Sequence, residues 1–489
     1  MARSVRWAAA ALAVLTLFRL LCAGVLPLSP DETYYWVWSR ALAPGYVDHP
    51  PMVALWIRVG TFLLGDCSLG VRILGPLAAA LTTLLLANAA DRMFPNQRAG
   101  LIAGALWNAT LFVGAGSVVM TPDAPLLFFW CATVWALARI VTGGGVGWWL
   151  AIGCFAGLAM ASKYTAAFLW LGIGLWILTA PSARHWLHHP APWAGALLGL
   201  ALVLPVVLWN AEHEWVSVLK QGGRVADWQP ERALVFLAEL IGGQIGLVTP
   251  GVLVLCVVGL VAAVRAARAG RDGGAGALQL ALTLPPVVVF IQHAFGDRVQ
   301  GNWPEIVYPA AIIAAAGLVA PRWHRWVWPS VGAGIALSAI VALHAVTGVL
   351  PLPVVSDPAA RNLAGWSQLA AKLETLGGHE QATFVVAEQY ALLSELAWNA
   401  SGAVPVIGIE PRLNPMALPR MDMRGRVGIL VRNEYRGDEI DPATWSSAIS
   451  LGMIERTTPR GIIERYRVWR VAGRIQGVVL PARRFAASE

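Results

Sequence analysis

Long apolar runs recur across residues 1–350 and restrict what this chain can fold into. A run of about 17–25 apolar residues is long enough to cross the hydrocarbon core of a membrane as one helix. Hydrophobic residues make up 57% of the chain and charged residues 13%, and the mean hydropathy is +0.60. That composition is far too apolar for a soluble globular protein. We expect a polytopic α-helical membrane protein with about eleven transmembrane helices, near residues 7–27, 71–90, 99–119, 124–142, 147–161, 164–180, 193–211, 247–264, 278–294, 306–320 and 327–346.

The basic residues predict how these helices are oriented. The net charge of +8 comes from arginines scattered between apolar runs, so it does not form the basic face that nucleic-acid binding requires. The segment 7–26 resembles a secretory signal, but the spans that follow favour a retained signal anchor. Short basic loops face the cytoplasm, and here they contain Arg3, Arg6, Arg92, Arg98, Arg184, the run RAARAGRDGG from Arg265 and PRWHRW from Pro321.

The other loops then face the opposite, outer side of the membrane. An odd number of spans places the C-terminal part on that side as well. Four of the five cysteines fall in apolar runs, so neither a disulfide framework nor a thiolate metal site is indicated. The outer stretches are 28–70, TPD at Thr121, SKY at Ser162, 212–232 and 295–305.

The tail of the chain changes character from about Val354 onward. Charge rises there, and TFVVA at Thr383, EQYALLSELAWNAS and GRVGILV at Gly425 alternate as strand, helix and strand. This pattern predicts a transmembrane domain at 1–350 and a small soluble α/β domain at 351–489. Two roles stay open for the soluble domain: it braces the membrane domain, or it takes part in substrate binding.

The densest polar chemistry lies just after the first apolar run, in SPDETYYWVWSRALAPGYVDHPPM. Ser29 and Glu32, with Pro30 between them, match a helix capping box with proline in the first turn. Capping accounts for only one of the two adjacent acids, Asp31 and Glu32. The aromatic residues that follow are typical of a helix lying at the membrane interface. Asp48 and His49 precede paired prolines and form a second rigid polar group.

The same pattern of cap, proline and acid recurs at MTPDAP. There Thr121 is the expected cap, Pro122 lies in the first turn and Asp123 lies just inside the next helix. Lys163 lies in a tight outer turn, where its ordinary structural role is to reach lipid phosphates. Further cations on the outer side are Lys220, Arg224 and Arg298. Carboxylates and cations on one membrane face suit a reaction on a phosphate-bearing lipid.

An ordered set of motifs carries a family resemblance. Asp31 and Glu32, DHPP, TPDAPLLFFW, GLAMASKYTAAFLW and NWPEIVYPA together resemble the bacterial branch of the protein mannosyltransferase-like family, within the GT-C glycosyltransferases. This branch is related to enzymes that add aminoarabinose or galacturonate to lipid A. The resemblance implies a sugar transferred with inversion from a polyprenyl-phosphate donor to an acceptor on the periplasmic face of the bacterial inner membrane.

The resemblance also implies roles for single residues. Asp31 matches the leading, catalytic acid of the first outer loop, and Glu32 either orients it or helps to hold a divalent metal. In relatives that act on lipid A, a lysine precedes the paired prolines and contacts the donor phosphate; His49 stands there in this chain. A neutral imidazole supplies a hydrogen bond where lysine supplies a charge. The residues expected to bind the donor are therefore Asp48, His49, Asp123, Lys163, Arg224 and Arg298.

The residue types fit this chemistry independently. Inverting transfer needs a carboxylate opposite the leaving group, and a lipid phosphate leaving group needs cations more than a proton donor. The sequence does not identify the sugar or the acceptor. The acceptor could be lipid A, another glycolipid, a polysaccharide or a protein. A transporter or flippase of a lipid-linked sugar is the rival interpretation, for which Arg19 within the first span is the one indication. A membrane scaffold is the third, and it leaves the grouped acids and cations unexplained.

Overall fold

The computed structural model describes residues 2–95, 98–222, 228–270, 273–437 and 439–483, which form two compact units. The membrane unit comprises Met1–Leu21, Asp48–Val53 and Leu74–Ala342. The sheet unit comprises Cys22–Val47, Ala54–Ile73 and Leu343–Glu489. Two helices run from one unit into the other, α1 (Ala2–Val25) and α18 (Val327–Thr347). The division into domains at 1–350 and 351–489 stays a prediction.

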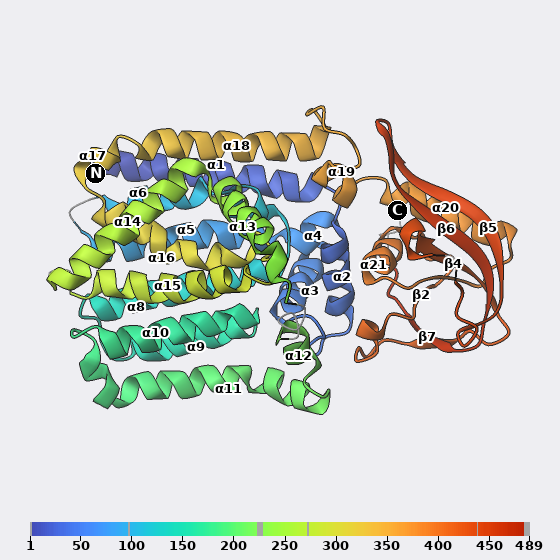
Figure 1. The fold of residues 1–489 in the computed structure, drawn as a ribbon, viewed down its shortest axis with the longest axis horizontal. Helices are drawn as coiled ribbons and strands as arrows, with labels where there is room; N and C mark the ends of the chain where they lie inside the picture. Colours follow the sequence, from blue (N-terminus) through green and yellow to red (C-terminus); the bar gives the residue numbers. More distant parts are fainter. Residues whose placement is uncertain (1, 96–97, 223–227, 271–272, 438, 484–489) are drawn as a thin grey trace. The chain divides into compact units, whose positions relative to one another are not determined.

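The membrane unit is a bundle of apolar helices, of which α8, α9, α10, α11 and α15 lie side by side (Figure 1). Besides α1 and α18, its helices are α5 (Leu74–Met93), α6 (Ala99–Asn108), α7 (Leu111–Gly114), α8 (Asp123–Val141), α9 (Trp148–Met160), α10 (Ala167–Thr179), α11 (Pro190–Glu212), α12 (Val216–Gly222), α13 (Ala233–Val248), α14 (Pro250–Ala269), α15 (Ala275–His293), α16 (Tyr308–Leu318) and α17 (Pro321–His324).

Hydropathy and length identify the helices that can cross a membrane. Among the described residues, seven helices are long and apolar enough, and a bent pair, Ala99–Asn108 with Leu111–Val118, makes an eighth. Shorter apolar helices follow at Met52–Leu64, Trp148–Met160, Tyr164–Thr179 and Trp303–Leu318. Each predicted run coincides with one of these elements. Two helices were not predicted as spans: Met52–Leu64, which was placed in an outer loop, and α13. The fold class, a polytopic helical membrane protein with a C-terminal sheet, is confirmed.

Arg19 lies at the bend between α6 and α7, where the two axes differ by 71°. Its side chain is 1% exposed, and its Nη2 donates to Oδ1 of Asn108 at 2.9 Å. Asn108 in turn donates to Thr83 Oγ1 at 2.9 Å and to the Gly104 carbonyl at 2.8 Å. A helix break inside a membrane exposes backbone groups that need partners. Arg19 and Asn108 supply polar partners at the break, so the buried arginine has a structural explanation.

The sheet unit holds a seven-stranded mixed sheet with the order β3-β7-β2-β1-β4-β6-β5. Strand β1 pairs in parallel with β2 and β4, and the other neighbours are antiparallel. Helix α21 connects β1 to β2, as a parallel pair requires. The predicted strand–helix–strand alternation is confirmed by β1, α21 and β4. The strands are β1 (Phe384–Ala387), β2 (Val406–Gly408), β3 (Arg420–Asp422), β4 (Val427–Asn433), β5 (Trp445–Thr458), β6 (Gly461–Gly473) and β7 (Gln476–Val479).

Helices complete the sheet unit. One face of the sheet forms an apolar core around Phe384, Val386, Ile407, Leu430 and Trp469. The stretch predicted as the first outer loop, 28–70, is itself mostly helical and belongs largely to this unit. The helices of the sheet unit are α2 (Pro30–Arg40), α3 (Met52–Leu64), α4 (Ser68–Arg72), α19 (Pro358–Leu363), α20 (Trp366–His379) and α21 (Tyr390–Asn399).

Candidate functional site

Glu32 closes the first turn of α2, and its carboxylate is fully engaged. It accepts hydrogen bonds from the Ser29 backbone N–H at 3.0 Å and the Ser29 hydroxyl at 2.9 Å. The guanidinium of Arg72 binds both of its oxygens, at 2.6 and 2.7 Å. The Glu32 and Arg72 side chains are 0% and 1% exposed. A paired, buried carboxylate of this kind holds structure together.

Arg72 also joins this corner to the end of α1. It donates to the backbone carbonyls of Ala23, Leu26 and Pro27, at 3.3, 2.7 and 2.7 Å. The last carbonyls of a helix have no partners within it, so a guanidinium there satisfies them. With Arg72 and Ser29 on both oxygens of Glu32, the Asp31–Glu32 pair does not fit a divalent metal. No group of three or more His, Cys, Asp or Glu residues suited to a metal occurs within the described part of the chain.

Asp31 differs from its neighbour because it is exposed. It lies in the first turn of α2, where the helix dipole favours a negative charge. The hydroxyl of Tyr390 donates to its Oδ1 at 3.3 Å. Glu32 thus has the capping role that the sequence predicts for one of the two acids. The catalytic role of Asp31 stays a prediction.

The aromatic side chains of α2 are buried in protein, so they do not contact lipid headgroups as the prediction of an interfacial helix requires. Tyr34, Tyr35, Trp36 and Trp38 are 0–7% exposed, buried within the protein. The Trp36 ring lies 5.0 Å from that of Trp398 in α21, and its indole N–H donates to Asp66 at 3.0 Å. Aromatic residues with a polar tip suit a protein interior as well as an interface when a partner is present, which is why composition alone misplaced them.

A second acid, Asp123, begins α8 in the membrane unit and sits in a polar cluster. Lys163 forms an ion pair with its Oδ1, and the Asn302 side-chain amide donates to its Oδ2 at 2.7 Å. Lys163 is 7% exposed, and the carboxyl group of Glu305, which is 4% exposed, lies beside that of Asp123. Thr121 does not cap α8 as predicted; its hydroxyl donates to Asp123 at 3.4 Å.

Sequence reasoning brought Asp123 and Lys163 to attention but missed Asn302 and Glu305. A signal for them was present. NWPE places an acid directly after a proline, with a polar residue shortly before them, as the sequences at the starts of α2 and α8 also do. Glu305 lies in the first turn of the short 3₁₀ helix Trp303–Val307, with Asn302 at its N-cap.

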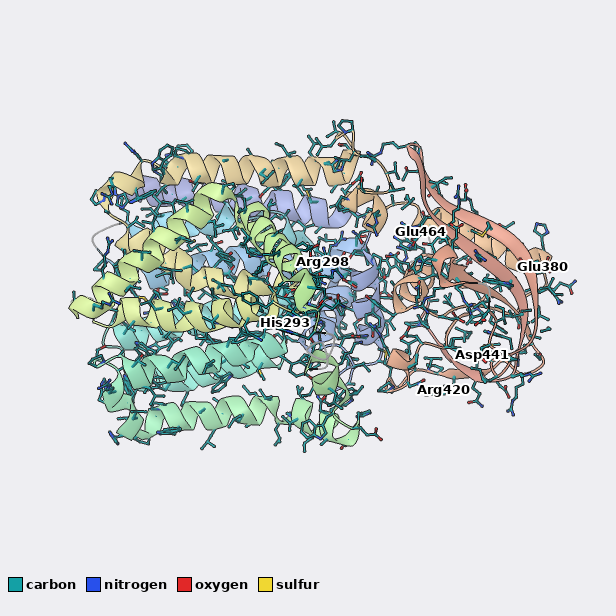
Figure 2. The ribbon with its side chains drawn as sticks, viewed as in Figure 1. His293, Arg298, Glu380, Arg420, Asp441 and Glu464 are labelled. Carbon is teal, nitrogen blue, oxygen red and sulfur yellow. The ribbon has the colours of Figure 1, made fainter. Side chains whose placement is uncertain are left out.

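Of the remaining predicted residues, Asp48 and Arg298 form ion pairs within the membrane unit. Asp48 pairs with Lys220, and the Gln221 amide donates to the Asp48 carbonyl at 2.8 Å. His49 is half-buried beside it. Arg224 lies outside the described residues. Arg298, labelled in Figure 2, pairs with Glu239 of α13 at 2.8 Å, and both side chains are exposed, at 61% and 38%.

Comparison with known proteins places these residues in context. The family model of dolichyl-phosphate-mannose-protein mannosyltransferase matches residues 48–209. The lipid A galacturonosyltransferase RgtD of Rhizobium johnstonii is 29% identical over 301 residues, 60% of this chain and 61% of that protein. A polyprenol-phosphate-mannose–protein mannosyltransferase of Mycolicibacterium smegmatis is 30% identical over 182 residues, 32% of this chain and 35% of that protein. The matches thus span about three fifths, or less, of these curated relatives.

Solved structures show the fold over nearly the whole chain. The crystal structure of ArnT from Cupriavidus metallidurans bound to undecaprenyl phosphate has a TM-score of 0.66 at 16% identity, covering 95% of this chain and 97% of that one. Its apo form has a TM-score of 0.61 at 16% identity, covering 96% and 98%. At this identity the likeness shows the GT-C fold. The predicted family resemblance is confirmed.

Proposed function

We propose that this chain, a relative of the protein mannosyltransferase-like branch of the GT-C glycosyltransferases, transfers a sugar from a polyprenyl-phosphate donor with inversion. The observation that carries the proposal is the contrast between two adjacent acids. Glu32 is buried and bound on both oxygens, whereas Asp31 is exposed in the first turn of α2. Asp31 is therefore the acid of the pair that can meet a substrate.

In the proposed reaction, a hydroxyl oxygen of the acceptor attacks the anomeric carbon of the donor sugar from the face opposite the phosphate. The new carbon–oxygen bond forms as the bond from the anomeric carbon to the phosphate oxygen breaks. That electron pair leaves with the polyprenyl phosphate. The acceptor proton passes to the Asp31 carboxylate, which later returns it to water. An acceptor phosphate would need no base, and Asp31 would then stabilise positive charge on the sugar.

Cations of the membrane unit are proposed to stabilise the departing phosphate. Arg298 is 61% exposed, and an exposed ion pair contributes little stability, so phosphate can replace Glu239 as its partner. Lys163 is fixed by Asp123 and gives a preorganised positive charge. We assign His49 a hydrogen bond to the donor, with Asp48 and Arg224 as further donor-binding residues.

The acceptor we propose is a glycolipid of the bacterial envelope, on the periplasmic side of the inner membrane. The match to an enzyme named for lipid A covers 60% of this chain, against 32% for the match to a protein mannosyltransferase, which favours a lipid over a protein. Polysaccharide and protein acceptors are the other outcomes that the experiment below distinguishes.

The test compares lipids of host cells that carry the wild-type chain, Asp31→Asn or Asp441→Asn. Asp441 is an exposed acid of the sheet unit, so its variant controls for the lost charge (Figure 2). We expect Asp31→Asn to lower transfer by about 10²–10⁴-fold, so that mass spectrometry shows one polyprenyl-phosphate sugar accumulating and one envelope glycan losing that sugar. A folded Asp31→Asn chain with an unchanged lipid profile would refute the role of Asp31.

A second measurement separates a transferase from a transporter. The purified wild-type chain in detergent is mixed with the lipid extract of Asp31→Asn cells, which contains the accumulated donor and the acceptor. A transferase releases polyprenyl phosphate in this mixture, where no membrane separates two compartments. A flippase releases none, and that result would overturn the proposal.

A further inference from the structure

Helix α21 of the C-terminal part packs against α2 of the first loop within the sheet unit (Figure 1). The contact has an aromatic part and a polar part. The Trp36 and Trp398 rings meet edge to face at 5.0 Å. The Thr33 hydroxyl donates to Ser394 Oγ at 3.2 Å, and the Ser394 hydroxyl lies 3.4 Å from the Pro30 carbonyl. These contacts attach α21 to α2 without involving Asp31.

Tyr390 begins α21 and makes a different contact. Its ring lies 4.6 Å from the Tyr34 ring, and the Arg412 guanidinium lies over it at 4.6 Å from the centroid. The two neighbours hold the ring, and its hydroxyl donates to Asp31 Oδ1 at 3.3 Å. The hydroxyl therefore meets the one acid of the first turn that is exposed.

We propose that Tyr390 is a positioning residue for Asp31, so that the C-terminal α/β part completes the catalytic site instead of only bracing the membrane helices. This inference rests on the function proposed above. An exposed aspartate samples several rotamers, and a hydrogen bond from a held side chain selects one of them.

The type of donor matters to this role. A phenol is neutral up to a pH of about 10, so it orients a carboxylate without cancelling its charge. A lysine or arginine at the same place would hold the carboxylate ionised and make it a weaker base. The Arg412 guanidinium lies over the face of the Tyr390 ring and helps to hold that ring in place. The hydrogen bond from Tyr390 thus fixes the direction of the Asp31 carboxylate without adding a charge of its own.

The test replaces Tyr390 with Phe, which removes the hydroxyl and keeps the ring between its neighbours. Ser394→Ala is the matched control, because it removes a hydroxyl from the same helix interface without touching Asp31. The substrate is the lipid extract of Asp31→Asn cells, titrated against each purified full-length variant. Initial release of polyprenyl phosphate gives a maximal rate and an apparent KM in extract concentration.

We expect Tyr390→Phe to lower the maximal rate about ten-fold with an unchanged apparent KM, equivalent to one hydrogen bond of about 1.4 kcal/mol. Ser394→Ala keeps the wild-type rate within about two-fold. Arg412→Ala removes a group that holds the Tyr390 ring, so we expect an intermediate loss of the maximal rate. This variant tests the contact between Tyr390 and Asp31 without changing either residue. Melting temperatures in detergent show that the variants are folded.

Two results would overturn the inference. The first is that Tyr390→Phe turns over at the wild-type rate. The second is that Ser394→Ala loses as much activity as Tyr390→Phe, which would mean that the interface only holds α21 and α2 together. Failure of the proposed function looks different. In that case Asp31→Asn cells accumulate no donor, and the wild-type chain releases no polyprenyl phosphate.

Discussion

The helices α2 and α8 both have a Pro-Asp pair at their starts, but the two aspartates have different partners. Each places a proline directly before an acid, Asp31 in α2 and Asp123 in α8. Asp31 stays exposed and receives a hydrogen bond from a neutral hydroxyl, that of Tyr390. Asp123 is held by the ammonium group of Lys163 and by an amide. A proline and an acid fix where a carboxylate lies on a helix, but its partners decide whether it can act as a base or serves to fix a cation.

The neighbour of Asp31 extends this comparison. Glu32 shares the same helix turn but is bound on both oxygens by Arg72 and Ser29. One residue step along a helix turns the side chain by about 100°, which here separates an exposed acid from a buried one. The two adjacent carboxylates therefore have separate consequences when they are changed, and the predictions below separate stability from activity.

The largest effect is expected from Arg72→Ala. It leaves the buried Glu32 carboxylate without its cation and removes three hydrogen bonds to backbone carbonyls in the last turn of α1 and just after it. Loss of one partner of a buried ion pair costs about 3–5 kcal/mol. Thermal unfolding in detergent measures the loss of stability. The double variant Arg72→Ala/Glu32→Ala should recover part of it, and equal stability of the single variant and wild type would show that the corner is not needed for folding.

Lys163→Met comes next and tests the other member of the comparison. Methionine keeps the length of the side chain and removes the charge that faces Asp123. We expect the rate of polyprenyl phosphate release to fall about 10²-fold, the usual cost of one preorganised charge at a leaving group. Lys372→Met is the control, because Lys372 bonds only the Glu455 carbonyl among the described contacts of its ammonium group. A Lys163→Met chain with full activity would make the cluster around Asp123 purely structural.

A third acid at a helix start, Asp357, is expected to make the stability of the folded protein depend on pH, with an effect of moderate size. It caps α19 and accepts hydrogen bonds from Arg460 at 2.5 Å and His344 at 3.1 Å. Burial alone would raise the pKa of Asp357, but these hydrogen bonds outweigh burial and hold the pKa below its ordinary value. A lowered folded-state pKa stabilises the fold above the unfolded pKa of about 3.9. This contribution is lost as the pH falls through the folded-state value.

Asp357→Asn should therefore lower stability near neutral pH by about 1–3 kcal/mol and lose less stability than wild type on acidification. Melting temperatures measured from neutral pH down to about pH 3 compare the two chains. Parallel pH curves would show that Asp357 does not contribute to the acid sensitivity of the sheet unit.

The sequence predicted local features well and distant partners poorly. Apolar runs located each predicted span, and the Ser29–Glu32 pattern located the start of α2, because both signals lie within a few residues. The partners of these acids come from far along the chain. Arg72 lies 40 residues from Glu32, and Tyr390 lies 359 residues from Asp31. Only the fold brings them together, and neither residue type is unusual enough to indicate a site by itself.

The smallest effect is expected from Arg298→Ala. This variant removes an exposed cation, whereas Lys163→Met removes a buried one. Its pair with Glu239 is open to solvent, and such pairs contribute about 0–1 kcal/mol. We expect unchanged stability and about a two-fold rise in the apparent KM for donor, an effect that added salt should abolish because salt screens exposed charges. Measuring Arg298→Ala beside Lys163→Met at low and high salt compares the two kinds of cation directly. A loss as large as that of Lys163→Met, and insensitive to salt, would transfer the main phosphate-binding role to Arg298 and reverse the importance assigned to the buried cluster.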